Sequence, residues 1–340
     1  MDGIALLLDK INVQVPFGRW QLFEFCDLTL VPPFVKHCCQ NTLTAQWTKR
    51  MPLLQRQYPA KLAADAVLEA IDGIGDIDTA DWEVIDFCSG GGGPVPYIEK
   101  LVNDGRKREG KRPIPFRLSD LYPNLNAWMQ HAALSENLSF VPQPVDASNP
   151  PLSVISATPS TNQRTAAAKH DHATTSGGKV CRLFCLAFHH FDDATARRVL
   201  KSTLETSDAF AILELQDRRT GSLVLMLLEF WLVLLISALW FWHDPVHLLL
   251  TYVVPVLPFV HSFDGFVSCL RTRTFEETIR LLDDRSGADS IRHDRLVERS
   301  AVHIRDWEFT HASALHTWPL GYMSITFGKR VESSNGDAGS

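Results

Sequence analysis

Between residues 81 and 215, short apolar runs alternate with segments of helical spacing, and this alternation restricts the fold more than any other feature of the chain. Strands that alternate with helices indicate a parallel sheet covered on both faces. We therefore predict an α/β fold built on a Rossmann-like sheet with helices on both faces. The expected strands are 83–87, 116–120, 139–145, 182–187 and 209–213.

The first expected strand runs into a glycine-rich turn. Asp86 stands at the end of the strand, Cys88 follows, and four consecutive glycines occupy positions 90–93. Glycines let a backbone turn tightly and approach a ligand closely, and the N-terminus of the helix that follows adds a favourable dipole. The dinucleotide pattern G-x-G-x-x-G would require a glycine where the sequence has Val95. A nucleotide-dependent oxidoreductase is therefore disfavoured.

The strand and turn resemble those of the class I S-adenosylmethionine-dependent methyltransferase family, whose first strand ends in the pattern D-x-G-x-G-x-G. Asp86, Gly90 and Gly92 match this pattern, whereas Cys88 stands at the first glycine position. The resemblance covers about residues 81–330. It implies a seven-stranded sheet closed by an antiparallel pair, and S-adenosylmethionine as the cofactor, with the turn around its methionine part.

Two more acids take places that the family uses for the rest of the cofactor. Asp120, followed by Leu121, ends the second expected strand, where the family's acid accepts hydrogen bonds from the ribose hydroxyls. Asp146, followed by Ala147, ends the third, where the family's acid meets the adenine amine. A single aspartate there is explained equally well as a helix cap or a turn residue. Three acids in order after three strands favour the cofactor interpretation.

The candidate catalytic residues follow the fourth and fifth strands. His189 and His190 end the fourth, and similar paired histidines lie beneath the cofactor's sulfur in many small-molecule methyltransferases. Either histidine has the pKa range of a general base, although both could simply form the pocket floor. Glu214 ends the fifth strand, and Asp264 closes the following insertion. Both are candidates for contacts with the methyl acceptor.

Residues 222–242 are almost entirely apolar and, as a helix, would span roughly 31 Å, the thickness of a bilayer core. A return segment, 246–260, contains Pro255 and Pro258 and is short for a second crossing. A two-span hairpin, a hairpin in one leaflet and a soluble apolar lid remain open. We expect membrane association through 222–260 with the catalytic domain in the cytosol; the alternative is a cytoplasmic protein.

The whole chain divides into a mostly helical N-terminal cap (1–80), a methyltransferase-like domain (81–330) and a polar tail (331–340). A flexible loop, 147–179, and the apolar insertion, 220–262, interrupt the domain. The net charge of −6 argues against a nucleic-acid partner. We expect no metal site, because the seven cysteines lack zinc spacing, and His170 and His172 lie in the polar loop.

These observations predict methyl transfer from S-adenosylmethionine to a small, lipophilic acceptor at or near a membrane. Two alternatives come from other classes of protein. The chain could be a non-catalytic membrane protein on the same scaffold, for which the cysteine at position 88 is an argument. It could also be an isomerase or cyclase that binds the cofactor without transferring its methyl group.

Overall fold

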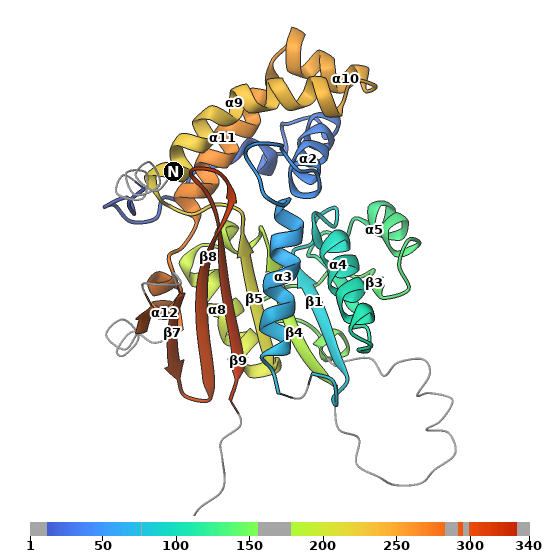
Figure 1. The fold of residues 1–340 in the computed structure, drawn as a ribbon, viewed down its shortest axis with the longest axis vertical. Coiled ribbons are helices and arrows are strands. Elements are labelled where there is room, and N and C mark those ends of the chain that lie inside the picture. Colours follow the sequence, from blue (N-terminus) through green and yellow to red (C-terminus); the bar gives the residue numbers. More distant parts are fainter. Residues whose placement is uncertain (1–11, 76, 156–177, 283–291, 295–298, 332–340) are drawn as a thin grey trace, which may run out of the picture.

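The computed structural model describes residues 12–75, 77–155, 178–282, 292–294 and 299–331 (Figure 1). Its centre is one nine-stranded sheet with the strand order β3-β2-β1-β4-β5-β9-β8-β7-β6. Strands β1 to β5 are parallel, and β9 pairs antiparallel with β5. The parallel strands are β1 (Trp82–Phe87), β2 (Phe116–Ser119), β3 (Leu138–Phe140), β4 (Lys179–Cys185) and β5 (Ala209–Glu214).

This strand order confirms the expected fold, a Rossmann-like class I methyltransferase sheet with an antiparallel end. The expected closing pair is formed by β8 (Trp307–Thr317) and β9 (Gly321–Arg330). Two further strands, β6 (Arg292–Asp294) and β7 (Arg299–Ile304), extend that end of the sheet beyond the seven strands that we predicted.

The sheet is covered on both faces because its strands send alternate side chains to two hydrophobic cores. Val84 of the fully buried β1 faces a core shared with helices α3 (Pro59–Asp72) and α4 (Val95–Arg108). Its neighbour Ile85 faces a second core. That core is shared with α8 (Asp193–Thr206) and α12 (Phe275–Leu282). Burial on both faces explains why these strands are continuous apolar runs.

The N-terminal part is helical, with η1 (Phe25–Asp27), α2 (Pro33–Thr48) and α3. Helix α3 contributes Ala63, Val67 and Ile71 to the same core as β1. Residues on both sides of the domain boundary expected at residue 80 therefore share one continuous core. The division into an N-terminal cap and a second domain remains a prediction. Of the expected flexible loop, residues 156–177 lie outside the described part of the chain, as do 332–340 of the tail.

The third strand is shorter than the predicted 139–145, because β3 ends at Phe140. Pro142 and Pro144 follow and have no N–H group to donate to a ladder. The chain still continues along β2, since Val141 N donates to Leu118 O and Val145 N donates to Asp120 O. This places Asp146 beside Asp120 without a strand. Helix α5 (Leu125–Ala132) precedes β3, and the short α6 (Leu152–Ile155) follows it.

The apolar insertion folds into a helical hairpin, which we call the arm (residues 220–271). It projects beyond the end of the sheet, with α2 beside it (Figure 1). Its long helix is of sufficient length and hydropathy to cross a bilayer, and the two returning helical segments are bent by 77° at Pro255. The elements are α9 (Thr220–Trp240), α10 (Pro245–Leu248), the π-helical η3 (Leu249–Val253) and α11 (Val256–Arg271).

In helix α9, polar side chains lie on the buried face and large apolar side chains lie on the exposed face, the reverse of a helix in a water-soluble protein. Its buried positions include Ser222, Glu229 and Ser237, and the side chain of Gln46 on α2 donates a hydrogen bond to Glu229. Its outer face is a stripe of large apolar side chains spaced three or four residues apart, each between 45% and 67% exposed. The stripe consists of Val224, Leu228, Trp231, Leu235 and Leu239. A helix in water shows the opposite arrangement.

Candidate functional site

The glycine-rich turn after β1 uses backbone conformations that L-residues adopt with strain. Gly90 and Gly92 have φ values of 52° and 99°, and Cys88 has a φ of 64°. A Cβ at Gly92 would lie 3.0 Å from the His131 ring. The turn closes through Gly92 N, which donates to Ser89 O at 2.7 Å, and α4 begins directly after it. Cys88 therefore adopts the left-handed conformation that a glycine would adopt without strain.

Asp86 is buried beneath this turn at the end of β1. Ser89 Oγ donates to its Oδ2 at 2.5 Å, whereas its Oδ1 has no hydrogen-bond partner among the described residues. Burial raises the pKa of Asp86 well above its usual value, against the opposing effect of the Ser89 hydrogen bond. Asp86 thus stabilises the turn and retains an unused buried acceptor.

Asp120 follows β2 and reaches the same turn. Its Oδ2 accepts from Gly90 N and its Oδ1 from Tyr122 N, both at 2.8 Å. A carboxylate can accept about four hydrogen bonds, so each oxygen keeps a free lone pair. Asp146 lies in a turn, where Ser148 N and Ser148 Oγ donate to its Oδ1, and it is exposed.

The three acids act on one side chain, that of Cys88. Burial raises the pKa of the Cys88 thiol, and the charges of Asp120, Asp86 and Asp146 raise it further. The carboxyl ends of β1 and β2 and the segment after β3 therefore converge on the glycine turn. Of the other predicted binding residues, Leu121 is exposed next to Asp120, and Ala147 is buried, with its carbonyl oxygen accepting from Arg182.

His189 and Glu214 form a buried pair at the ends of β4 and β5. His189 Nδ1 lies 2.7 Å from Glu214 Oε2, and the backbone N–H of His189 donates to Glu214 Oε1 at 3.0 Å. The carboxylate fixes the orientation of the ring and leaves Nε2 directed away from it. A histidine held in this way can serve as a base or as a metal ligand, because both uses need the same lone pair on Nε2.

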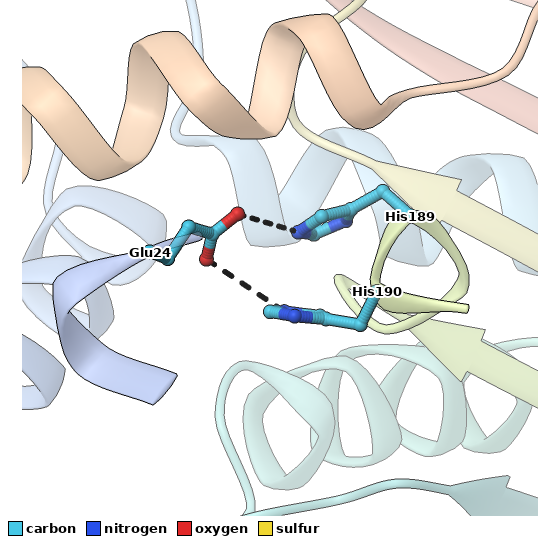
Figure 2. A group of neighbouring side chains, drawn as sticks. All are labelled: Glu24, His189 and His190. Atoms are coloured by element: carbon cyan, nitrogen blue, oxygen red, sulfur yellow. Dashed lines mark ion pairs between the residues drawn. The ribbon is translucent and has the colours of Figure 1, made fainter. Parts of the chain in front are cut away.

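A third acid, Glu24, comes from the N-terminal segment and faces both histidines (Figure 2). Its carboxylate oxygens lie 3.8 Å from His189 Nε2 and 3.9 Å from His190 Nε2. Arg271 lies 3.0 Å from Glu24, and Ser268 Oγ donates to it at 2.9 Å. Sequence reasoning missed this residue, because nothing in the N-terminal segment pointed to the histidines.

Asp264 positions the segment that carries Glu24. Its two oxygens accept from Phe25 N at 2.7 Å and Cys26 N at 3.0 Å. Burial raises the pKa of Asp264, and these two hydrogen bonds oppose that effect. The carboxylate is therefore engaged with the backbone of the N-terminal segment, and Asp264 lies within α11.

The acids around the turn and the histidine group lie at the same end of the sheet. Cys185 ends β4 between them, and burial together with the charges of Asp86 and Glu214 raises the pKa of its thiol. The structure therefore brings Asp86, Asp120 and Asp146 together around the turn. It places His189, His190 and Glu214 in a second group one strand away.

Comparisons with known proteins give distant structural likenesses. No family model and no curated protein matches the chain. The magnesium protoporphyrin IX methyltransferase of Synechocystis PCC 6803 with bound SAH is 10% identical, covering 79% of this chain and 83% of that chain with a TM-score of 0.38. The plantazolicin methyltransferase BpumL, in complex with a pentazolic desmethylPZN analog and SAH, is 11% identical, covering 88% and 100% with a TM-score of 0.42.

A putative Zn-dependent alcohol dehydrogenase from Rhodobacter sphaeroides also matches, at 10% identity and a TM-score of 0.33, covering 80% of this chain and 98% of that chain. These overlaps are too low to carry an argument. We therefore assign the fold from the strand order and infer the function from the geometry of the site.

Proposed function

We propose that the protein transfers a methyl group from S-adenosylmethionine to a small, lipophilic acceptor. The observation that carries this proposal is the convergence of three acids on a glycine turn at the carboxyl ends of parallel strands. Asp86 accepts from Ser89 and Asp120 from Gly90, and the N–H of Val145, the residue before Asp146, donates to Asp120 O. In open α/β sheets this edge is where ligands bind. The free lone pairs of Asp120 fit a ligand rich in hydroxyl donors.

Two of the acids and the glycine turn would each contact a different part of the cofactor. Asp120 would accept hydrogen bonds from the ribose hydroxyls, Asp146 would meet the adenine amine, and the turn at Gly90 and Gly92 would enclose the methionine part. The bound cofactor supplies an electrophilic methyl group on a sulfonium. The contribution of the chain is to hold the acceptor in line with that methyl group and to exclude water.

A lipophilic acceptor is supported by aromatic side chains around Glu24. Phe25 packs against Phe263 and Phe259, with ring centroids 4.9 and 5.6 Å apart, and Phe23 packs on Phe263 at 5.5 Å. Two of these rings flank Glu24 in sequence, and the other two belong to α11 of the arm. An acceptor that reaches the histidines from this side would have an apolar body and one polar end.

Membrane association through the arm is supported by the inverted polarity of α9. Polar and small residues at helix contacts and apolar residues outside are typical of helices in lipid. Helix α2 packs beside the arm. Lys36 within α2 and Lys49 directly after it carry charges that oppose deep insertion of the arm into the bilayer. We therefore favour an arm that lies in one leaflet, with Trp231 and Trp242 exposed at its surface and the sheet in the cytosol.

The test is incubation of the purified protein, with and without detergent, with labelled methyl donor and a lipid extract. Label in an extractable product, absent when Asp120 is replaced by alanine, supports the transferase. Cofactor binding without any labelled product would contradict methyl transfer and favour an isomerase or cyclase. No cofactor binding at all would favour the non-catalytic scaffold.

A further inference from the structure

His189 and His190 share an arrangement in which each ring has one nitrogen near a carboxylate and the other directed toward Glu24. For His189, Nδ1 lies 2.7 Å from Glu214 and Nε2 faces Glu24. For His190, Nδ1 lies 3.1 Å from Arg271 Nη1 and 3.5 Å from Asp27, and Nε2 faces Glu24. The two rings lie with their centroids 4.2 Å apart. Figure 2 shows both rings turned toward the same carboxylate.

The distances from Nε2 to Glu24, 3.8 and 3.9 Å, are too long for hydrogen bonds. They are close to what a shared cation requires. One ligand atom from each of the three residues lies within 4.8 Å of the others. Around a tetrahedral zinc ion, neighbouring nitrogen and oxygen ligands lie about 3.3 Å apart. Binding of one ion would therefore require the three side chains to move closer together.

The charges around the two rings also favour a cation. Among the described residues, the ionisable groups in contact with them are the carboxylates of Glu24, Asp27 and Glu214 and the guanidinium of Arg271. With both histidines neutral, three negative charges and one positive charge leave a surplus of two negative charges. One divalent cation would neutralise it, as would protonation of both histidines.

We propose that Glu24, His189 and His190 bind one divalent transition-metal ion of the zinc type. Imidazole and carboxylate ligands suit such ions, and the carboxylates behind both rings are the usual outer partners of metal-bound histidines. Arg271 Nη1 lies 3.1 Å from His190 Nδ1 and donates to it, so metal binding through Nε2 requires Arg271 to leave this nitrogen, whose proton is then directed toward Asp27. This departs from the absence of a metal site that we expected from the sequence.

Three protein ligands leave at least one coordination position open. Under the proposed function, that position takes an oxygen of the acceptor, and this role rests on the proposed function. Binding of the metal itself does not depend on the proposed function. The two inferences also use Nε2 of His189 differently, since a metal-bound nitrogen is not free to act as a base.

The test is calorimetric titration of the full chain with Zn²⁺, with Mg²⁺ as a comparison and Co²⁺ absorption as a second readout. We expect one Zn²⁺ per chain and no comparable binding of Mg²⁺, which prefers oxygen ligands. Glu24→Gln and His190→Ala should each weaken Zn²⁺ binding by more than about 100-fold. Asp27→Asn should weaken it by about 10- to 100-fold, the range of outer-shell changes. The exposed His303, replaced by alanine, is the matched control.

Equal Zn²⁺ affinity in the wild type, Glu24→Gln and His190→Ala would place the ion elsewhere and overturn the proposal. Absence of Zn²⁺ binding would do so as well. Thermal unfolding without metal identifies a variant that has lost its fold. If Glu24→Gln or His190→Ala has done so, the Zn²⁺ affinity of Asp27→Asn is compared with that of the wild type instead. S-adenosylmethionine binding, titrated separately, distinguishes failure of this site from failure of the proposed function.

Discussion

The carboxylate of Asp120 accepts a hydrogen bond from the backbone N–H of Gly90 at 2.8 Å, which joins the end of β2 to the turn after β1. The acid and the turn therefore form one rigid unit before any ligand binds. Two segments that would each have to be ordered separately are already in place. Such preorganisation reduces the entropic cost of binding.

Asp120→Ala should weaken S-adenosylmethionine binding by about 10- to 100-fold. Hydrogen bonds to a charged group are each worth about 1.5 to 3 kcal/mol, and the substitution also leaves Gly90 N without its acceptor. Calorimetry of the variant against the wild type measures the change. Glu136→Ala, which removes an exposed acid before β3, is the control and should bind as the wild type does. Unchanged affinity in Asp120→Ala would contradict the assigned role.

Gly92→Ala should destabilise the protein by about 1 to 3 kcal/mol, because a φ of 99° is unfavourable for alanine and its Cβ would contact His131. The neighbouring Gly91 has no such φ, and a Cβ added there would lie 3.8 Å from its nearest heavy atoms. Gly91→Ala is therefore the matched variant, with a much smaller effect. Urea unfolding compares the two, and equal losses would refute the strain argument.

Cys88→Gly should preserve cofactor binding and raise stability by up to about 1 kcal/mol, since glycine adopts a φ of 64° without steric strain. Cys88→Val should lower stability, because a β-branched side chain tolerates this conformation poorly. Both free energies of unfolding come from urea titrations. A less stable glycine variant would mean that contacts of the thiol outweigh the relief of strain.

Leu235→Asp combined with Leu239→Asp should abolish co-flotation of the protein with lipid vesicles, because both side chains lie on the apolar stripe of α9. Burying two charges in the acyl region costs several kcal/mol. Leu134→Asp changes an even more exposed leucine, just after α5, and should leave flotation intact. If the wild type does not float, or if the control loses flotation too, the arm does not mediate membrane association.

The stability that His311 and His316 contribute should fall as the pH drops below about 6.5, whereas the buried Asp86, whose pKa is raised, contributes in the opposite sense. Burial lowers the pKa values of His311 and His316 to about 4, so the unfolded chain binds more protons than the folded one between those limits. Each histidine contributes a slope of up to about 1.4 kcal/mol per pH unit in this window. Burial raises the pKa of Asp27, but His190 and Arg271 lower it to about 2, so its effect appears only under more acidic conditions.

The measurement is the free energy of urea unfolding at pH 7.5 and pH 5. His316→Gln removes one titrating group and should flatten the dependence on pH, although loss of the contact between His316 Nε2 and Leu215 O lowers stability at both values. A slope identical to that of the wild type would show that His316 does not titrate as its burial requires.

The sequence alone determined the α/β class, the order of the five parallel strands and the turn at Gly90 and Gly92, although the predicted third strand was too long and the predicted fourth began three residues late. These are local properties, because apolar runs and glycines specify backbone conformation within a few residues. The register that makes Asp120 reach Gly90 follows from two neighbouring strands. The short β3 was within reach too, since Pro142 and Pro144 show where its ladder must stop.

Tertiary structure alone decided which groups meet the histidines. Glu24 faces His189 because Asp264 on the arm holds η1, which begins directly after Glu24, and no sequence spacing encodes a contact between three segments so far apart. The outward direction of Leu235 and Trp231 is likewise a result of packing, since the equally apolar Val233 and Ile236 of the same helix are buried. Contacts between distant segments depend on the whole packed chain, whereas strands and turns depend on their neighbours in sequence.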